Sequence, residues 1–199
     1  MNRNIPTIND VLADFDHPNP NINRCAFKNM KEFWPRESIV ILIRNLDSRN
    51  IPLRRKSVKA LGYFGISIVK DIIQLYFSSK DNILKVSCLK VLVIVASNHC
   101  LNDFKEEMKK VIDAGIKDQS VEIILSTISL LRQIGEESLP YLKALCRDKN
   151  VLKAKAAITA ISEIPEMSVD PFLKSIISDS SLDILVREGA YQALNFKVN

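Results

Sequence analysis

Apolar residues recur along this chain at intervals of three and four rather than two, which predicts helices and excludes a fold built on strands. The clearest instance is residues 53–62, Leu-Arg-Arg-Lys-Ser-Val-Lys-Ala-Leu-Gly. Five other segments share its pattern: residues 23–30, 84–92, 123–131, 153–161 and 186–194. Equivalent positions in successive copies are 31, 31, 39, 30 and 33 residues apart, so the sequence predicts an array of internal repeats.

The six copies align in three columns. A small residue forms the first column: Ala26, Ser57, Cys88, Thr127, Ala157 and Ala190. A large apolar residue follows it directly: Phe27, Val58, Leu89, Ile128, Ile158 and Tyr191. Four residues after the small one stand Met30, Leu61, Leu92, Leu131, Ile161 and Leu194. Offsets of zero, one and four lie on one helix face, and a small residue there lets a neighbouring helix approach closely.

A shorter apolar pattern precedes each copy and predicts a second helix in every repeat. These patterns cover residues 7–15, 37–46, 67–77, 103–116, 136–146 and 168–177. The polar turns between the paired helices contain Asp16, Asp47, Asp81, Asp118, Asp148 and Asp179. We expect these aspartates to accept hydrogen bonds from the free N–H groups that open the next helix. Two helices per repeat, repeated six times, predict an all-α α-solenoid in one domain, residues 1–199.

Three passages carry a resemblance to a known family. Leu46-Asp47, followed by residues 53–62, resembles the helix opening of a short HEAT repeat. Residues 16–24, Asp-His-Pro-Asn-Pro-Asn-Ile-Asn-Arg, resemble the D-x-P-x-P-x-hydrophobic-x-R turn of short HEAT repeats. Residues 186–194, Val-Arg-Glu-Gly-Ala-Tyr-Gln-Ala-Leu, resemble a closing copy of the same repeat. Together they make the chain similar to the phycobilisome lyase family of HEAT-like proteins. Within this CpcE/CpcF and CpeY/CpeZ group, the length and repeat number are most similar to the small CpeZ-type members.

The resemblance implies a fold and a function. The fold would be a right-handed superhelix of about six short HEAT-like repeats, with the second helix of each pair on the concave side. The function would be to help attach a linear tetrapyrrole, a bilin, to a phycobiliprotein cysteine, as a lyase subunit or as a chaperone. The implied partners are a phycobiliprotein subunit and a second HEAT-repeat lyase chain, with bilin bound only transiently and no permanent cofactor.

Other functions stay open at this stage. No catalytic motif of the family can be placed on this chain, so an enzyme and a chaperone are both compatible with it. Residues 82–134 depart most from the repeat pattern, with Val86 and Leu125 where the first two copies carry Arg24 and Arg55. The first alternative is a HEAT-repeat adaptor without bilin chemistry, and the second is a protein that binds nucleic acid.

Charge is distributed unevenly along the chain. Residues 1–100 hold 15 lysines and arginines against 8 acidic residues, whereas residues 101–199 hold 13 against 15. Such an asymmetry is typical of a protein that binds an anionic partner through one half, although a solvated surface also carries lysines.

The basic residues of the first half fall on one predicted surface. Two positions after the small column the helix points away from the core, and this column reads Lys28, Lys59, Lys90, Ser129, Thr159 and Gln192. The candidate site residues for an acidic partner or for bilin carboxylates are Arg24, Lys28, Lys31, Arg55, Lys56, Lys59 and Lys90. Lysine supplies charge there, and arginine can hold a carboxylate through two parallel N–H bonds.

Cysteine and histidine offer little catalytic chemistry. The four cysteines match no zinc or redox spacing, and Cys25, Cys88 and Cys146 are predicted to be buried packing residues. His99 and Cys100 are adjacent in the longest repeat, where an insertion is expected at residues 96–104, but no third orienting group is identifiable. We expect His17 in a surface turn. Trp34 is expected to pack between the first two repeats.

Nucleic-acid binding and membrane insertion are both disfavoured. Base stacking needs exposed aromatic residues, whereas Phe27, Phe33, Phe64 and Tyr191 are predicted to be core residues. No apolar run reaches the roughly 18 residues of a membrane span, and the first residues show no apolar signal core. We therefore expect a cytoplasmic protein. If a partner docks at the C-terminal end, that end should expose apolar side chains in the unbound protein. The candidates are Phe172, Ile176, Ile177 and Phe196.

Overall fold

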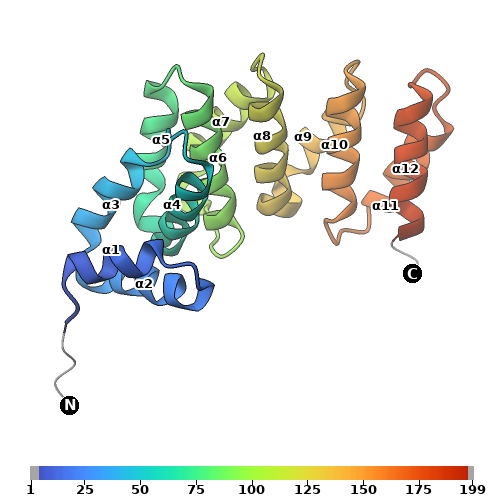
Figure 1. Cartoon of the computed structure of the whole chain (residues 1–199). Helices are drawn as coiled ribbons and strands as arrows, with labels where there is room; N and C mark the ends of the chain where they lie inside the picture. Colours follow the sequence, from blue (N-terminus) through green and yellow to red (C-terminus); the bar gives the residue numbers. More distant parts are fainter. Residues whose placement is uncertain (1–4, 197–199) are drawn as a thin grey trace. The chain divides into compact units, whose positions relative to one another are not determined.

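The computed structural model describes residues 5–196 and shows six helical hairpins and no strand within that range (Figure 1). The first three hairpins are α1 (Ile8–Asp16) with α2 (Pro20–Phe33), α3 (Pro35–Arg44) with α4 (Ile51–Phe64), and α5 (Val69–Ser78) with α6 (Asn82–Ala96). The last three are α7 (Lys105–Ile116) with α8 (Val121–Ile134), α9 (Leu139–Leu145) with α10 (Val151–Ser162), and α11 (Val169–Ser178) with α12 (Ile184–Phe196). Short 3₁₀ turns precede α5, α7 and α9: η1 (Gly65–Ile68), η2 (Asn102–Phe104) and η3 (Gly135–Ser138). The predicted all-α array of six repeats is confirmed.

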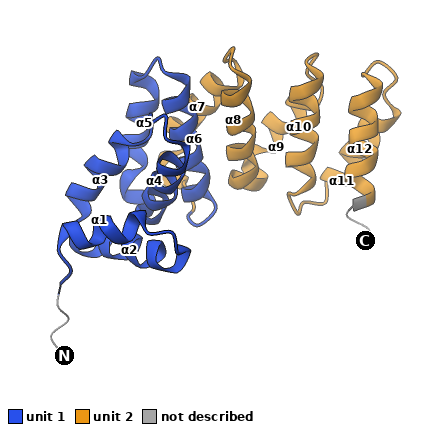
Figure 2. Ribbon diagram, in the orientation of Figure 1, with its two compact units in different colours: residues 1–99 blue, residues 100–199 orange. Residues whose placement is uncertain are grey.

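The contacts group the chain into two compact units, Met1–His99 and Cys100–Asn199 (Figure 2). The first unit contains α1 to α6 and the second α7 to α12, so each holds three repeats. In the second unit, α8, α10 and α12 stand side by side, and α10 contacts both of the others. That the whole chain forms one domain stays a prediction.

A repeated polar turn opens the second helix of each hairpin, but aspartate is seldom its cap. The side chains that accept from the first free N–H groups are Asn19, Asn50, Asp81, Ser120, Asn150 and Asp183. Asp118 and Asp148 instead accept from the backbone N–H groups of Ser120 and Asn150, at 2.9 and 2.8 Å. They hold the residue that caps the helix, and only Asp81 plays the predicted role directly.

The column of small residues lies at the centre of the packing. Ala26, Ser57, Cys88, Thr127, Ala157 and Ala190 are all 0% exposed. In the fourth repeat, a Cβ placed on Gly115 of α7 would lie 2.1 Å from Oγ1 of Thr127 on α8. The two helices of that hairpin therefore touch at the small residue, as the column predicted.

Neighbouring repeats approach closely at a second position. A Cβ on Gly62 of α4 would lie 2.3 Å from Cγ2 of Ile94 on α6. Repeats also share polar contacts: the hydroxyl of Ser87 on α6 donates to the carbonyl oxygen of Leu46 at 2.7 Å, where both groups are buried. In the second unit, salt bridges at the surface join Lys105 to Glu137 and Arg132 to Glu163. Exposed pairs of this kind contribute little to stability.

The two ends of the array depart from the predicted burial. Cys25 is exposed although a buried packing role was predicted, and Tyr191 is 59% exposed although it was predicted to be core. Cys25 directly precedes the small column, at the position where Lys56 and Ser87 reach back to the preceding repeat. No repeat precedes α1 among residues 5–196. Tyr191 occupies the column that is at most 7% exposed in the other five repeats, and no repeat follows α12 among the described residues.

The apolar residues proposed for a C-terminal docking end are mostly not free. Ile176 is buried, and Phe172 and Ile177 pack, partly buried, against the same core cluster. The side chain of Phe196 lies outside the described residues. The large apolar side chains exposed on α12 are instead Ile184, Leu185 and Tyr191.

One helical stretch, Ile51–Ser78, is long and apolar enough by composition to cross a membrane, and 56% of its most apolar window is buried inside the structure. It is not one straight helix. It comprises α4, η1 and α5, with a reversal at Gly65, whose φ of 68° is a conformation that favours glycine. Its apolar side chains form the core of the second and third hairpins.

Ala157→Leu should destabilise the protein by about 1–3 kcal/mol, because Ala157 is 0% exposed and a larger side chain must displace its neighbours. Thr159→Leu on the exposed face of the same helix is the matched control and should change stability little. Chemical denaturation measures both. An Ala157→Leu midpoint equal to that of the unaltered protein would contradict the column alignment.

Two glycine substitutions should change stability in opposite directions. Gly189→Ala places a Cβ 3.8 Å from Cγ of Lys155, which is ordinary contact, so better helix propensity should stabilise the protein by up to about 1 kcal/mol. Gly62→Ala should destabilise it, because the Cβ collides with Ile94. Adding Ile94→Ala to Gly62→Ala should relieve most of the collision, because it removes Cγ2 of Ile94 and leaves Cβ 3.0 Å away. Thermal melts of the unaltered protein and the three variants measure these effects, and a Gly62→Ala variant more stable than the unaltered protein would contradict this packing.

Candidate functional site

The positive charge of the first unit is concentrated on the second helices of its hairpins. Helices α2, α4 and α6 together carry 9 lysines and arginines and 1 acidic residue, Glu32. Helices α1, α3 and α5 together carry 3 basic and 5 acidic residues. The basic excess found in the sequence is therefore polarised to one layer of helices within this unit.

Five of these cations project freely and define what we call the basic face: Arg24, Lys28, Arg55, Lys59 and Lys90. All five are exposed, and none forms a hydrogen bond or ion pair with the described residues. Helices α4 and α6 contain no acidic residue that could neutralise them.

The arrangement of the basic face costs the fold some stability. Arg24 and Lys28 are four residues apart on α2, and Arg55 and Lys59 are four apart on α4. Like charges at this spacing face each other and destabilise a helix by about 0.2–0.5 kcal/mol per pair. An anionic ligand would relieve that repulsion.

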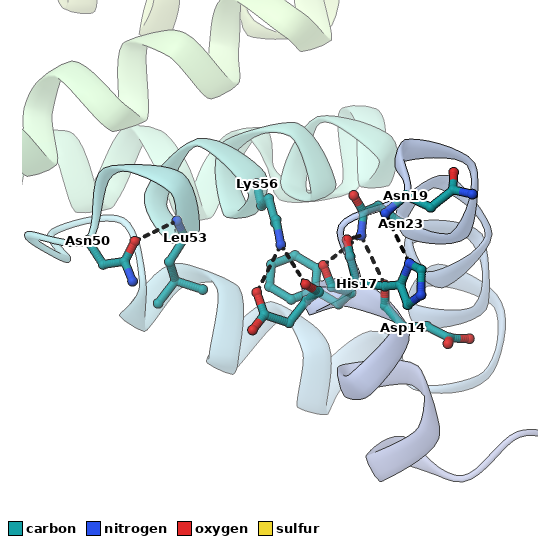
Figure 3. A network of polar contacts seen from close by, with 9 residues as sticks. Asp14, His17, Asn19, Asn23, Asn50, Leu53 and Lys56 are labelled. Atoms are coloured by element: carbon teal, nitrogen blue, oxygen red, sulfur yellow. Dashed lines mark hydrogen bonds and ion pairs between the residues drawn. The ribbon is translucent and has the colours of Figure 1, made fainter.

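The two other predicted site residues, Lys31 and Lys56, each form a hydrogen bond to the neighbouring repeat. Nζ of Lys31 donates to the carbonyl oxygen of Tyr63 at 2.9 Å. Nζ of Lys56 donates to the carbonyl oxygen of Asp16 at 3.0 Å and to Oδ1 of the same residue at 2.9 Å (Figure 3). It also lies 6.0 Å from the ring centroid of Phe15, so the charge of Lys56 is used within the fold.

The turn between α1 and α2 is organised by polar side chains rather than by a catalytic group. Nδ2 of Asn23 lies within hydrogen-bonding distance of the carbonyl oxygens of Asp14, Phe15 and His17, where α1 ends (Figure 3). Nδ1 of His17 accepts from the backbone N–H of Asn19 at 3.0 Å. His17 is thus a turn residue, as predicted.

Sequence reasoning missed one residue beside the basic face. Tyr63 lies one helical turn after Lys59, is 37% exposed, and packs edge-on against Phe27 with ring centroids 5.4 Å apart. Its place four residues after Lys59 was the available signal. It supplies a partly exposed aromatic surface at the junction of α2 and α4.

The outward column of the second unit is neutral. The hydroxyls of Ser129 and Thr159 donate to the carbonyl oxygens four residues earlier, at 2.9 and 3.2 Å. These hydroxyl hydrogens are therefore already bonded within their own helices. Since serine, threonine and glutamine are also uncharged, this part of the column offers an anion little attraction.

The cysteines fall into two classes. Burial raises the pKa of the thiols of Cys88 and Cys146 to about 12, which confirms their role as packing residues. Cys25 and Cys100 are exposed, and all four cysteines are free.

The remaining residues singled out from the sequence lie at separate places. His99 is exposed, and a Cβ on Gly65 would lie 2.7 Å from its Nε2. Nε1 of Trp34 donates to the carbonyl oxygen of Pro6 at 3.0 Å, so this half-buried indole fastens the segment before α1 to the junction of α2 and α3. No group of three His, Cys, Asp or Glu side chains in residues 5–196 could hold a metal ion.

Two curated proteins are similar to most of the chain. One is the bilin biosynthesis protein CpeZ of Synechococcus sp. (strain WH8020), 26% identical over 169 residues, which cover 82% of this chain and 91% of that protein. The other is the uncharacterized phycocyanin operon protein Z of Pseudanabaena tenuis (strain PCC 7409), 25% identical over 190 residues, 95% of this chain and 94% of that protein. The chain resembles CpeZ-type bilin proteins. No family model matches it.

A solved structure supports the fold alone. The E. coli protein YibA superposes with a TM-score of 0.58 at 13% identity, over 96% of this chain and 71% of YibA. The resemblance read from the repeat motifs is therefore confirmed by relatives of similar length, and the helical architecture by a solved structure.

Cys25 and Cys100 should react with a chromogenic thiol reagent at pH 8, whereas Cys88 and Cys146 should not. The pKa of about 12 keeps the two buried thiols protonated until the pH rises far above 8, and burial also blocks the reagent. We expect two rapid equivalents in the native protein and four after denaturation. In the Cys100→Ser variant, one thiol, that of Cys25, should still react rapidly. If it does not react, Cys25 is buried and the exposure described for the first repeat is wrong.

Proposed function

We propose that this chain binds a phycobiliprotein subunit through its basic face and assists covalent attachment of a bilin to a cysteine of that subunit. It acts as a lyase subunit or as a chaperone of the lyase. The observation that carries the proposal is the set of five exposed cations, Arg24, Lys28, Arg55, Lys59 and Lys90, on helices with almost no acidic residue. The similarity to a protein named for bilin biosynthesis supplies the chemical context.

The chemistry of the basic face suits carboxylates. Each arginine can hold a carboxylate through two parallel N–H bonds, and each lysine adds a compact charge. Two ligands of the proposed system carry such groups: the acidic side chains of a protein partner, and the propionates of a bilin. The bilin is a transient ligand in this proposal, and a second HEAT-repeat chain is a further partner.

The proposed place of action is the cytoplasm, where thiols stay reduced and four free cysteines can persist. An adaptor with no part in bilin chemistry would use the same face, so the test below separates the two functions.

Lys28→Glu, Lys59→Glu and Lys90→Glu combined should leave the fold intact, because exposed charges contribute little to stability. Covalent bilin on the phycobiliprotein should fall by about tenfold or more, because three attractive charges become repulsive. The assay is co-expression of the chain with a phycobiliprotein subunit, its lyase and a bilin-producing system, scored by visible absorbance of the denatured adduct.

The control for this experiment is a second charge reversal elsewhere, Lys70→Glu, Lys109→Glu and Lys149→Glu, which changes the net charge equally at exposed positions. It should yield as much adduct as the unaltered chain. If unaltered chain does not increase the adduct with phycocyanin or phycoerythrin subunits, the role in bilin attachment is wrong. Equal adduct from both triple variants would show that the basic face takes no part.

A further inference from the structure

The cations of the basic face lie on three helices that pack in succession, α2 against α4 and α4 against α6. Helices α2 and α4 meet where Phe27 and Lys31 contact Tyr63, and α4 and α6 meet where Gly62 contacts Ile94. Helices in such direct contact have axes about 8–10 Å apart. Lys28 and Lys59 lie within about one turn of the first contact, and Lys59 and Lys90 within about one turn of the second. The lysines therefore form a row with one cation per helix.

A second row accompanies the first. Arg24 and Arg55 precede Lys28 and Lys59 by four residues on the same helix faces, which places them about 5–6 Å away. The third helix carries the apolar Val86 at the equivalent position. The face thus presents two rows of cations across neighbouring helices, with the partly exposed ring of Tyr63 beside them.

We infer that the occupant of this face is an α-helical segment of the partner, with carboxylates seven residues apart, lying across α2, α4 and α6. Seven residues make about two turns and span about 10.5 Å, close to the separation of the helices it crosses. Carboxylates four residues from these lie on the same face of that segment and meet the arginine row. The inference rests on the proposed function only in taking the partner to be a protein.

Other backbone conformations fit less well. In a β-strand, side chains on one face repeat every two residues, at about 6.6 Å or multiples of it, which misses the spacing of the row. A polyproline II segment repeats on one face every three residues, at about 9.3 Å, and could follow the lysine row. It is narrow and presents a single line of side chains, so it leaves Arg24 and Arg55 unpaired.

Three labelled peptides of about 22 residues and equal charge test the inference with the full chain. The first is an alanine-rich helix with five glutamates on one face, at positions 4, 8, 11, 15 and 18 (spacings of about one and two turns). The second has the same composition with the glutamates distributed around the helix. The third is a proline-rich segment whose five glutamates are spaced three residues apart. Fluorescence anisotropy at low salt measures their binding.

The first peptide should bind about tenfold or more tightly than the other two, and added salt should weaken it. The Lys28→Glu, Lys59→Glu, Lys90→Glu protein should lose this binding and gain affinity for the same peptide with lysine in place of glutamate. The Lys70→Glu, Lys109→Glu, Lys149→Glu protein should bind like the unaltered chain. A protein that had lost its fold would lose binding to the glutamate peptide without gaining binding to the lysine peptide. The gain therefore indicates direct contact between the altered residues and the peptide.

Several results would overturn the inference: no binding of the first peptide, equal binding of the first two, or tighter binding of the proline-rich segment. Tighter binding of single-stranded DNA than of the first peptide would also overturn it. These failures are distinct from failure of the proposed function. If the peptides fail while the lysine reversal abolishes bilin attachment, the basic face still binds the partner, but not through a helix of this pattern.

Discussion

Close approach of helices at one small residue per repeat is the constraint on which the rest of this structure depends. All six residues of that column are fully buried, whether they are alanine, serine, cysteine or threonine. A larger side chain there would separate the helices and expose the two apolar columns beside it. The thiol of Cys88 belongs to this column, and its raised pKa is a consequence of the same burial.

The packing also decides which side chains remain available to a ligand. Because each helix has one face committed to the columns, the positions two residues before and after the small residue point outward. In the first unit these positions are mostly cationic, and the like-charge pairs on α2 and α4 are not neutralised by acids on their own helices apart from Glu32. The fold tolerates that repulsion because many buried contacts offset it. A surface of this kind fits a protein that resembles bilin biosynthesis proteins and is proposed to bind an anionic partner.

Cys25 and Tyr191 are more exposed than predicted, and both lie at the ends of the array. The column of Tyr191 is buried in the other five repeats, and the position of Cys25 is buried or partly buried in the other five. A column alignment treats all copies as equivalent, whereas a stack gives its first and last members only one neighbour. The terminal positions therefore need a correction that no local pattern contains.

The sequence by itself determined the helices, their pairing into six repeats and the inward columns, because helix periodicity is a local property of the chain. It also placed Arg24, Lys28, Arg55, Lys59 and Lys90 on an outward face. Asn19, Asn50 and Asn150 cap their helices in place of the predicted aspartates, and they do so through N–H groups two or three residues later, which is a local feature of each turn. Only the tertiary structure decided that Lys31 and Lys56 bond to the backbone of a neighbouring repeat and that Tyr63 lies beside the basic face. These outcomes depend on distances between residues up to about 40 positions apart, and such distances are set by how the helices pack and not by their periodicity.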